Sequence, residues 1–104
     1  MSDSDGPRTL TADHFHAPLR QRMEQRGITE EEVRTTMRQG WKASDAKPGT
    51  VGRTLVFPYN AEWEGTQYQE KEVTVYYKVD GDDLVLLTAI ARYGRDFPRT
   101  PEAP

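Results

Sequence analysis

The apolar residues in the first third of the chain recur at helical spacing. One stripe, in steps of four residues, consists of Phe15, Leu19 and Met23. Pro18 suits the first turn of such a helix, where a missing N–H costs nothing, and Gly27 suits its end. The pattern therefore predicts a helix over 17–26.

A second helix is predicted from a capping signal. The letters T-E-E-E at residues 29–32 form a capping box, in which the threonine is the N-cap and the last glutamate is the third helical residue. The three acids also favour the positive end of the helix dipole. Val33 and Met37 provide the apolar stripe. We predict a helix over 30–39, joined to the first as an antiparallel helical hairpin.

After Gly40 the apolar residues change from helical spacing to alternation, which is typical of β-strands. The predicted strands are a short one at 41–43 and longer ones at 53–57, 71–79 and 84–92. Residues 60–68 are interpreted as a long loop. The last two strands are expected to form a hairpin about Asp80-Gly81.

The faces of this hairpin follow from its alternation. Odd-numbered residues from Lys71 to Val79 share one face, and the even-numbered residues share the other. The return strand leaves neither face polar, which predicts a central position in the sheet with both faces covered. Pairing across the turn is expected to place Leu84, Leu86 and Ile90 on the face of Val73, Val75 and Tyr77. Leu86 and Ile90 are therefore predicted core residues.

Two helices followed by three or four antiparallel strands predict an α+β fold, with the helical hairpin packed on one face of the sheet. The 104 residues fit a single small domain, expected at 12–96. Residues 1–11 and 97–104 are expected to be disordered tails.

The composition and motifs of the chain exclude several kinds of functional site. The absence of cysteine excludes disulfides, thiolate metal sites and cysteine nucleophiles. The sequence has neither a signal peptide pattern nor a run of about 18 apolar residues, so we expect a cytoplasmic protein with no membrane partner. It also shows no Gly-rich phosphate loop, serine triad or paired-carboxylate site, and we expect no metal or cofactor. The net charge of −3 argues against attraction of the whole molecule to nucleic acid.

Three stretches of the sequence together resemble a known family. They are His16-Ala17 followed by R-M-E-Q-R-G-I at 22–28, the T-E-E-E-V helix start at 29–33, and VTVYYKV…LVLLTAIARYG within 73–94. This combination is similar to a group of small bacterial and archaeal domains with an HA-x-x-RM-x-x-RGI signature. Those domains are distantly similar to the RelE/ParE toxin fold, in which a helical hairpin packs on an antiparallel sheet. The resemblance covers about residues 14–94.

The resemblance also implies a location for catalysis. RelE-type toxins cleave mRNA without a metal, and they use Arg, Lys and Tyr on the sheet to stabilise phosphorane charge and move protons. The corresponding groups here are Arg92, Tyr93 and Arg95 at the end of the last strand, with Lys78 or Arg53 adding positive charge. His16 is a further catalytic candidate, as a general base.

Several of these residues also have a structural interpretation. His16 fits a capping role at the helix start, and it could instead form a metal pair with His14, although no third ligand stands nearby. The helical arginines either contact phosphate or cover the sheet edge with their stems. These arginines are Arg20, Arg22 and Arg26. Trp63 either anchors a partner or covers the core.

Two functions are consistent with these observations. The first is a RelE/ParE-like domain that acts on ribosome-bound mRNA and has an antitoxin as its protein partner. The second is a non-catalytic interaction module on the same scaffold, able to form a homodimer. A basic cleft around Arg92 and Arg95 would favour the first function, and an apolar patch near Trp63 would favour the second.

Overall fold

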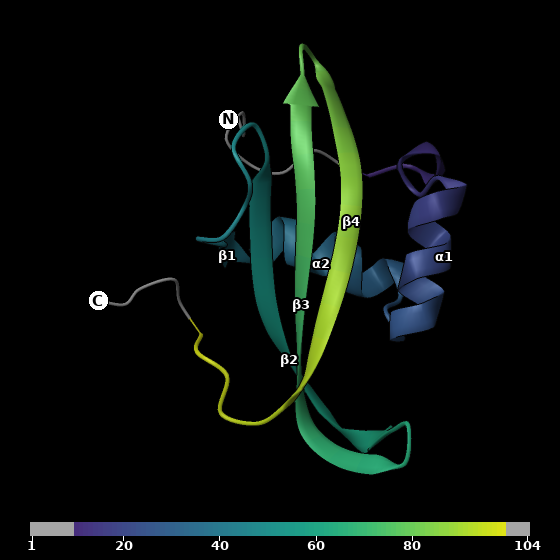
Figure 1. Ribbon diagram of the computed structural model, residues 1–104, viewed down its shortest axis with the longest axis vertical. Coiled ribbons are helices and arrows are strands. Elements are labelled where there is room, and N and C mark those ends of the chain that lie inside the picture. Colours follow the sequence, from purple (N-terminus) through teal and green to yellow (C-terminus); the bar gives the residue numbers. More distant parts are fainter. Residues whose placement is uncertain (1–9, 100–104) are drawn as a thin grey trace.

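Two helices followed by a four-stranded antiparallel sheet make up the computed structural model, which describes residues 10–99 (Figure 1). The helices are α1 (Ala17–Arg26) and α2 (Glu30–Gln39), preceded by the 3₁₀ turn η1 (Ala12–His14). The strands are β1 (Trp41–Lys42), β2 (Val51–Trp63), β3 (Thr66–Asp80) and β4 (Asp83–Gly94), and they lie side by side in that order. The predicted α+β fold is confirmed.

Both helices begin and end at the predicted residues, because local contacts fix their ends. The His16 side chain accepts a hydrogen bond from the Leu19 N–H and caps α1. Gly27 ends α1 in the left-handed conformation, with a φ of 72°. In α2, Thr29 Oγ1 accepts from the Glu32 N–H and the Glu32 carboxylate accepts from the Thr29 N–H, each at 3.0 Å. The predicted capping box is therefore present.

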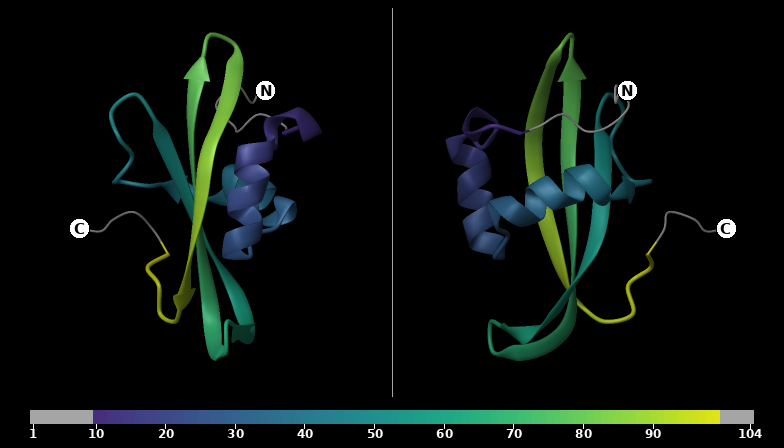
Figure 2. Two further views of the ribbon diagram at one scale, coloured as in Figure 1. Left: turned by 45° about the vertical axis from the view of Figure 1, so that its right-hand side comes forward. Right: turned by 180° about the vertical axis from the view of Figure 1, so that it is seen from behind.

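The two helices do not form the predicted antiparallel hairpin. Helix α1 runs beside β4, whereas α2 crosses β2 and β3 (Figures 1 and 2). The connection between them is short, and its Ile28 is buried, with its N–H donating to the Met23 carbonyl at 2.8 Å. Because the connection is itself anchored in the core, it turns the chain sharply and directs α2 across the sheet.

Strands β2 and β3 are longer than predicted and form a continuous hairpin. The predicted loop at 60–68 is wrong, because Trp63 pairs with Thr66 across a turn at Glu64-Gly65. A bulge between Pro58 and Ala61 interrupts the alternation that marks a strand in a sequence. This end of the hairpin also extends past the main sheet (Figure 1), where fewer of its side chains need to be apolar.

Strand β4 lies at the edge of the sheet, so its predicted central position is wrong. Its register with β3 shifts where Tyr76 pairs with Thr88 and Tyr77 pairs with Leu86, which leaves Leu87 as a bulge. A shift of one residue moves the remaining side chains to the other face. Ile90 consequently pairs with Thr74 on the face opposite Leu86, and the predicted common face of Leu86 and Ile90 is wrong. Leu86 is buried, whereas Ile90 is only partly buried.

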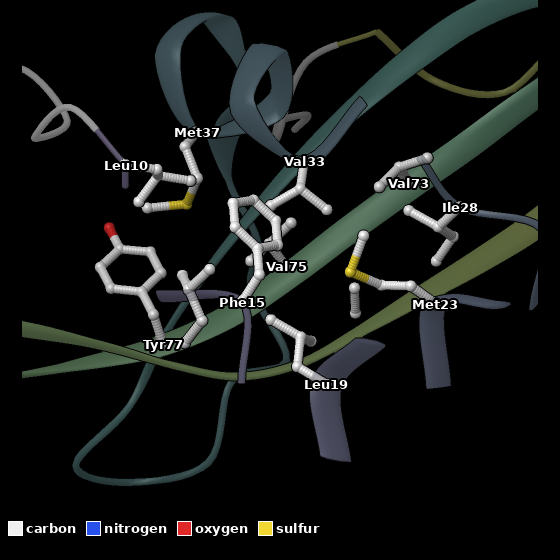
Figure 3. Packing of buried hydrophobic residues seen from close by; sticks show 12 residues of the cluster. Leu10, Phe15, Leu19, Met23, Ile28, Val33, Met37, Val73, Val75 and Tyr77 are labelled. Carbon is white, nitrogen blue, oxygen red and sulfur yellow. The ribbon is translucent and has the colours of Figure 1, made fainter. Parts of the chain in front are cut away.

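The hydrophobic core lies between the helices and one face of the sheet (Figure 3). The apolar stripes of both helices pack there against the odd-numbered residues of β3. The residues contributed by β3 are Val73, Val75 and Tyr77. The predicted face of this strand is therefore confirmed.

The ordered chain extends beyond the predicted domain at both ends. Leu10 is buried in the core, and its carbonyl accepts a hydrogen bond from Arg34. Leu10 therefore packs with the folded domain, although the predicted tail at 1–11 includes it. Residues 97–99 lie against the sheet, where the Phe97 N–H donates to the Glu70 carboxylate at 3.1 Å. The remainder of both predicted tails, 1–9 and 100–104, lies outside the described residues. None of the helices within 10–99 is long and apolar enough to cross a membrane.

Candidate functional site

A lysine is buried where the helix connection meets β3. Lys71 is 2% exposed, because alternation places it on the core face of the strand. Its Nζ donates to the Gly27 carbonyl and lies 2.8 Å from Oε1 of Glu32. Glu32 therefore serves both as a capping residue and as the counter-ion of a buried cation. A buried charge requires partners of this kind, so Lys71 ties the helix connection to the sheet.

Aromatic rings complete the surroundings of this ammonium group. The ring centroids of Tyr59 and Tyr93 lie 5.6 and 5.5 Å from the Lys71 Nζ, within the range of a cation–π interaction. Trp63 stacks on Tyr93 with 5.0 Å between ring centroids, so it covers this corner of the core. The Tyr93 hydroxyl donates to the Arg26 carbonyl at 2.7 Å. Burial above all raises the pKa of Tyr93, so this hydroxyl stays protonated to a higher pH than a solvent-exposed phenol does.

The three residues predicted to face a phosphate lie on different surfaces. Tyr93 pairs with Lys71 on the helix face, whereas Arg92 pairs with Glu72 on the opposite face. The Arg92 side chain is 67% exposed, and its Nη1 lies 3.4 Å from the Glu72 carboxylate. Arg95 lines a separate shallow hollow with residues 67–69. Within residues 10–99, Arg92 and Arg95 therefore line different hollows and do not form a common basic cleft.

Both histidines are engaged in local structure. Nδ1 of His16 accepts from the Leu19 N–H at 3.3 Å, and Nε2 lies 2.8 Å from the Leu86 carbonyl, to which it donates. These contacts define the neutral tautomer with the proton on Nε2. His14 Nδ1 accepts from the Thr11 N–H at 2.9 Å. With both ring nitrogens occupied, His16 has no free atom to act as a general base in this arrangement.

Most of the other predicted phosphate contacts have partners inside the protein. Arg26 donates to the Ala89 carbonyl at 2.9 Å, and Arg53 donates to the Gly40 carbonyl at 2.8 Å. Arg20 forms an ion pair with Glu30. The two remaining candidates are exposed: Arg22 lies on α1, and Lys78 lies near the end of β3.

The face of the sheet turned away from the helices carries a groove of about 240 Å³. Both helices lie on the other side of the sheet (Figure 2), and Figure 1 views the molecule from the open side. The even-numbered residues of β3 line the groove together with the residues after β1 and the C-terminal segment. The lining includes Trp41, Asp45, Glu72, Tyr76, Ile90 and Arg92.

Several polar side chains in this groove are buried although no helix of residues 10–99 covers them. The hydroxyls of Thr54 and Thr74 lie 2.8 Å apart, and Glu72 is 9% exposed. Tyr76 donates its hydroxyl to Asp45 Oδ1 at 2.9 Å. Burial, followed by the hydrogen bond and charge of Asp45, raises the pKa of Tyr76 to about 12. The groove is thus a fixed polar surface with aromatic residues beside a carboxylate.

A second hollow, of about 500 Å³, lies between η1 and the end of the β3–β4 hairpin. It is lined by His14 and His16, which are occupied as described, and by Asp13, Asp82 and Asp83. No group of three or more His, Cys, Asp or Glu within 10–99 is arranged to hold a metal ion. This hollow therefore offers exposed carboxylates without a defined site.

No protein-family model, curated protein or solved structure matches this chain. The similarity to the HA-x-x-RM-x-x-RGI domains therefore rests on the sequence motifs alone.

The alternation of β3 contains a signal for the groove. Glu72, Thr74 and Tyr76 alternate with core residues on β3, so their common face was predictable. What alternation could not show is that Trp41, Asp45 and Pro98 line the same groove as Glu72 and that Glu72 is buried there. Those contacts join segments far apart in the chain.

Proposed function

We propose that this chain is a non-catalytic protein-interaction module that binds its partner on the open face of the sheet. The observation that carries the proposal is the groove there, which combines Trp41 and Tyr76 with the buried carboxylate of Glu72. Aromatic residues are enriched in protein–protein interfaces and contribute much of their binding energy.

The edges of the sheet are less suited to binding by strand addition. Two carbonyl groups of β4, those of Leu86 and Ala89, accept from His16 and Arg26 of the α1 segment. On β2, Pro58 and the bulge that follows it interrupt the edge beyond the short strand β1. Features of this kind block pairing with another strand, which favours a face of the sheet as the binding surface.

A metal-independent ribonuclease of RelE type, with an antitoxin as partner, is the competing proposal. It requires Arg92, Tyr93 and Arg95 to act on one phosphate. The contacts described above give it less support, since Tyr93 is held under Trp63 and Arg92 lies on the opposite face.

Site-specific crosslinking tests the interaction proposal. Trp41 is replaced by the photo-crosslinker p-benzoylphenylalanine in the full chain, and irradiation is performed in cells that naturally contain the protein. We expect a discrete adduct, which a heterologous partner or a second copy of the chain would equally provide. The matched control places the same crosslinker at Glu31, an exposed residue of α2 on the other side of the sheet.

Adducts from neither position, or the same adducts from both, would contradict the proposal. RNA binding at low salt that is weakened in the Arg92→Ala, Arg95→Ala double variant would instead support the ribonuclease.

A further inference from the structure

Glu72 is a buried carboxylate whose ion-pair partner is an exposed arginine. It lines the groove and is 9% exposed. Among the described residues its ion-pair partner is Arg92, at 3.4 Å. Lys71, the neighbouring residue on the other face, is by contrast held by a carbonyl, a carboxylate and two aromatic rings. A buried carboxylate is most stable when a cation and well-formed hydrogen bonds surround it.

Arg92 fills this role only loosely. Two-thirds of its side chain is in contact with solvent, and its guanidinium lies 5.4 Å from the ring centroid of Phe97. An ion pair with such an exposed partner is weakened by solvent, so Arg92 can be displaced from Glu72 at little cost. The groove therefore holds an internal cation that another cation can replace.

The walls of the groove suit a planar cation. Trp41 and Tyr76 both line it, and guanidinium groups stack on aromatic rings and bind carboxylates through two parallel hydrogen bonds. Tyr76 is held in place because its hydroxyl donates to Asp45 and its ring lies over Gly52, where a Cβ would approach Tyr76 Cε1 to 3.0 Å. The arrangement is fixed before any partner arrives.

The size of the groove limits the ligand. At about 240 Å³ it falls below the ~300–1,000 Å³ of sites that enclose whole cofactors or drug-sized molecules. A single long side chain from a partner fits this volume better than a free metabolite does.

We propose that the groove binds one arginine side chain of a partner protein, with Glu72 receiving its guanidinium and Arg92 acting as the internal cation that it displaces. This inference rests on the proposed function, because it names the partner chemistry of the same surface. It assigns opposite effects to the two members of the Glu72–Arg92 pair: loss of Glu72 removes the site, and loss of Arg92 removes a competitor.

The test is an NMR titration of the full chain with the peptide acetyl-Gly-Gly-Arg-Gly-Gly-amide. The control peptide carries citrulline, a neutral isostere of arginine. We expect the arginine peptide to shift the Trp41 indole and the amide signals of Glu72 and Tyr76, and the citrulline peptide to leave them unchanged at equal concentration.

Three variants sharpen the test. Glu72→Gln is expected to weaken arginine binding at least about tenfold, the scale of a lost charge-assisted hydrogen bond. Arg92→Ala is expected to tighten it about threefold, the scale of an exposed ion pair. Asp83→Asn, which removes an exposed carboxylate outside the groove, is expected to leave it unchanged. Thermal unfolding checks that each variant is folded.

Equal binding of the two peptides, unchanged binding by folded Glu72→Gln, or weaker binding by Arg92→Ala would overturn the proposal. If the peptide does not bind while the Trp41 crosslink persists, the interaction module stands and its specificity for arginine is wrong. If the crosslink also fails, the proposed function falls with it.

Discussion

At the scale of single residues, neighbouring charged residues on β3 have opposite environments. Lys71 faces the core and Glu72 faces the groove, and both are buried. The lysine has close partners from the helix connection and the aromatic cluster, whereas the glutamate has one exposed arginine. The physical difference suggests different roles: Lys71 maintains the fold, and Glu72 is available to a partner.

Replacement of Lys71 tests the first role. Lys71→Met keeps most of the volume of the side chain but leaves the Glu32 carboxylate without its cation, so we expect a loss of about 3 kcal/mol in the free energy of unfolding. Urea unfolding of the purified variant measures the change. Lys78→Met, at an exposed position of the same strand, is the control and should change stability by less than about 0.5 kcal/mol. Equal effects of the two substitutions would show that the buried ion pair does not stabilise the fold.

At the scale of secondary-structure elements, the bulge at Leu87 determines which residues of β4 reach the core. Leu86 lies before it and is buried against the helices, whereas Ile90 lies after it on the open face. We expect Leu86→Ala to cost about 2–5 kcal/mol and Ile90→Ala less than half as much, because truncating a partly buried side chain leaves a smaller cavity. Urea unfolding of the two variants in parallel gives both values. An Ile90 effect as large as that of Leu86 would contradict the register.

The helices protect the exposed edge of β4, and this protection can be tested separately. Arg26→Ala removes the donor to the Ala89 carbonyl, so we expect the variant to self-associate through β4 at concentrations where the natural chain does not. Sedimentation velocity over a concentration series measures this. Arg22→Ala, which alters an exposed residue of the same helix, serves as the control. Identical sedimentation of both variants would show that Arg26 is not needed to protect the edge.

The elements that the sequence predicted well are those fixed by neighbouring residues. Both helices have local caps, at His16 and Thr29, and their bounds were predicted correctly. The bulge at Leu87, the edge position of β4 and the crossing of α2 depend on contacts between distant segments, and alternation alone does not contain them. The same limit applies to the site. The face that Glu72 occupies was predictable, but its burial, and the residues from distant segments that line the same groove, were not.

At the scale of the whole molecule, each face of the sheet carries a tyrosine whose pKa is raised on folding. On the helix face, Tyr93 is locked under Trp63, and its pKa is raised mainly by burial. On the open face, Tyr76 is raised to a pKa of about 12 by burial and by Asp45. Because proton loss from either phenol is unfavourable in the folded state, high pH should destabilise the molecule at both faces.

The contribution of Tyr76 can be isolated with Tyr76→Phe, which removes the hydrogen bond to Asp45 and the ionisable group together. A pKa raised from 10.0 to about 12 on folding gives stability that is complete below pH 10 and is lost as the pH rises through 12, since the unfolded chain releases the proton first. The natural chain should therefore be more stable than the variant at neutral pH, and this difference should shrink between pH 10 and pH 12. Urea unfolding across that range measures it, with tyrosinate absorbance reporting the ionisation directly. A difference that stays constant across the range would mean that Tyr76 ionises alike in the folded and unfolded chains, and that the open face is not held by the Tyr76–Asp45 contact.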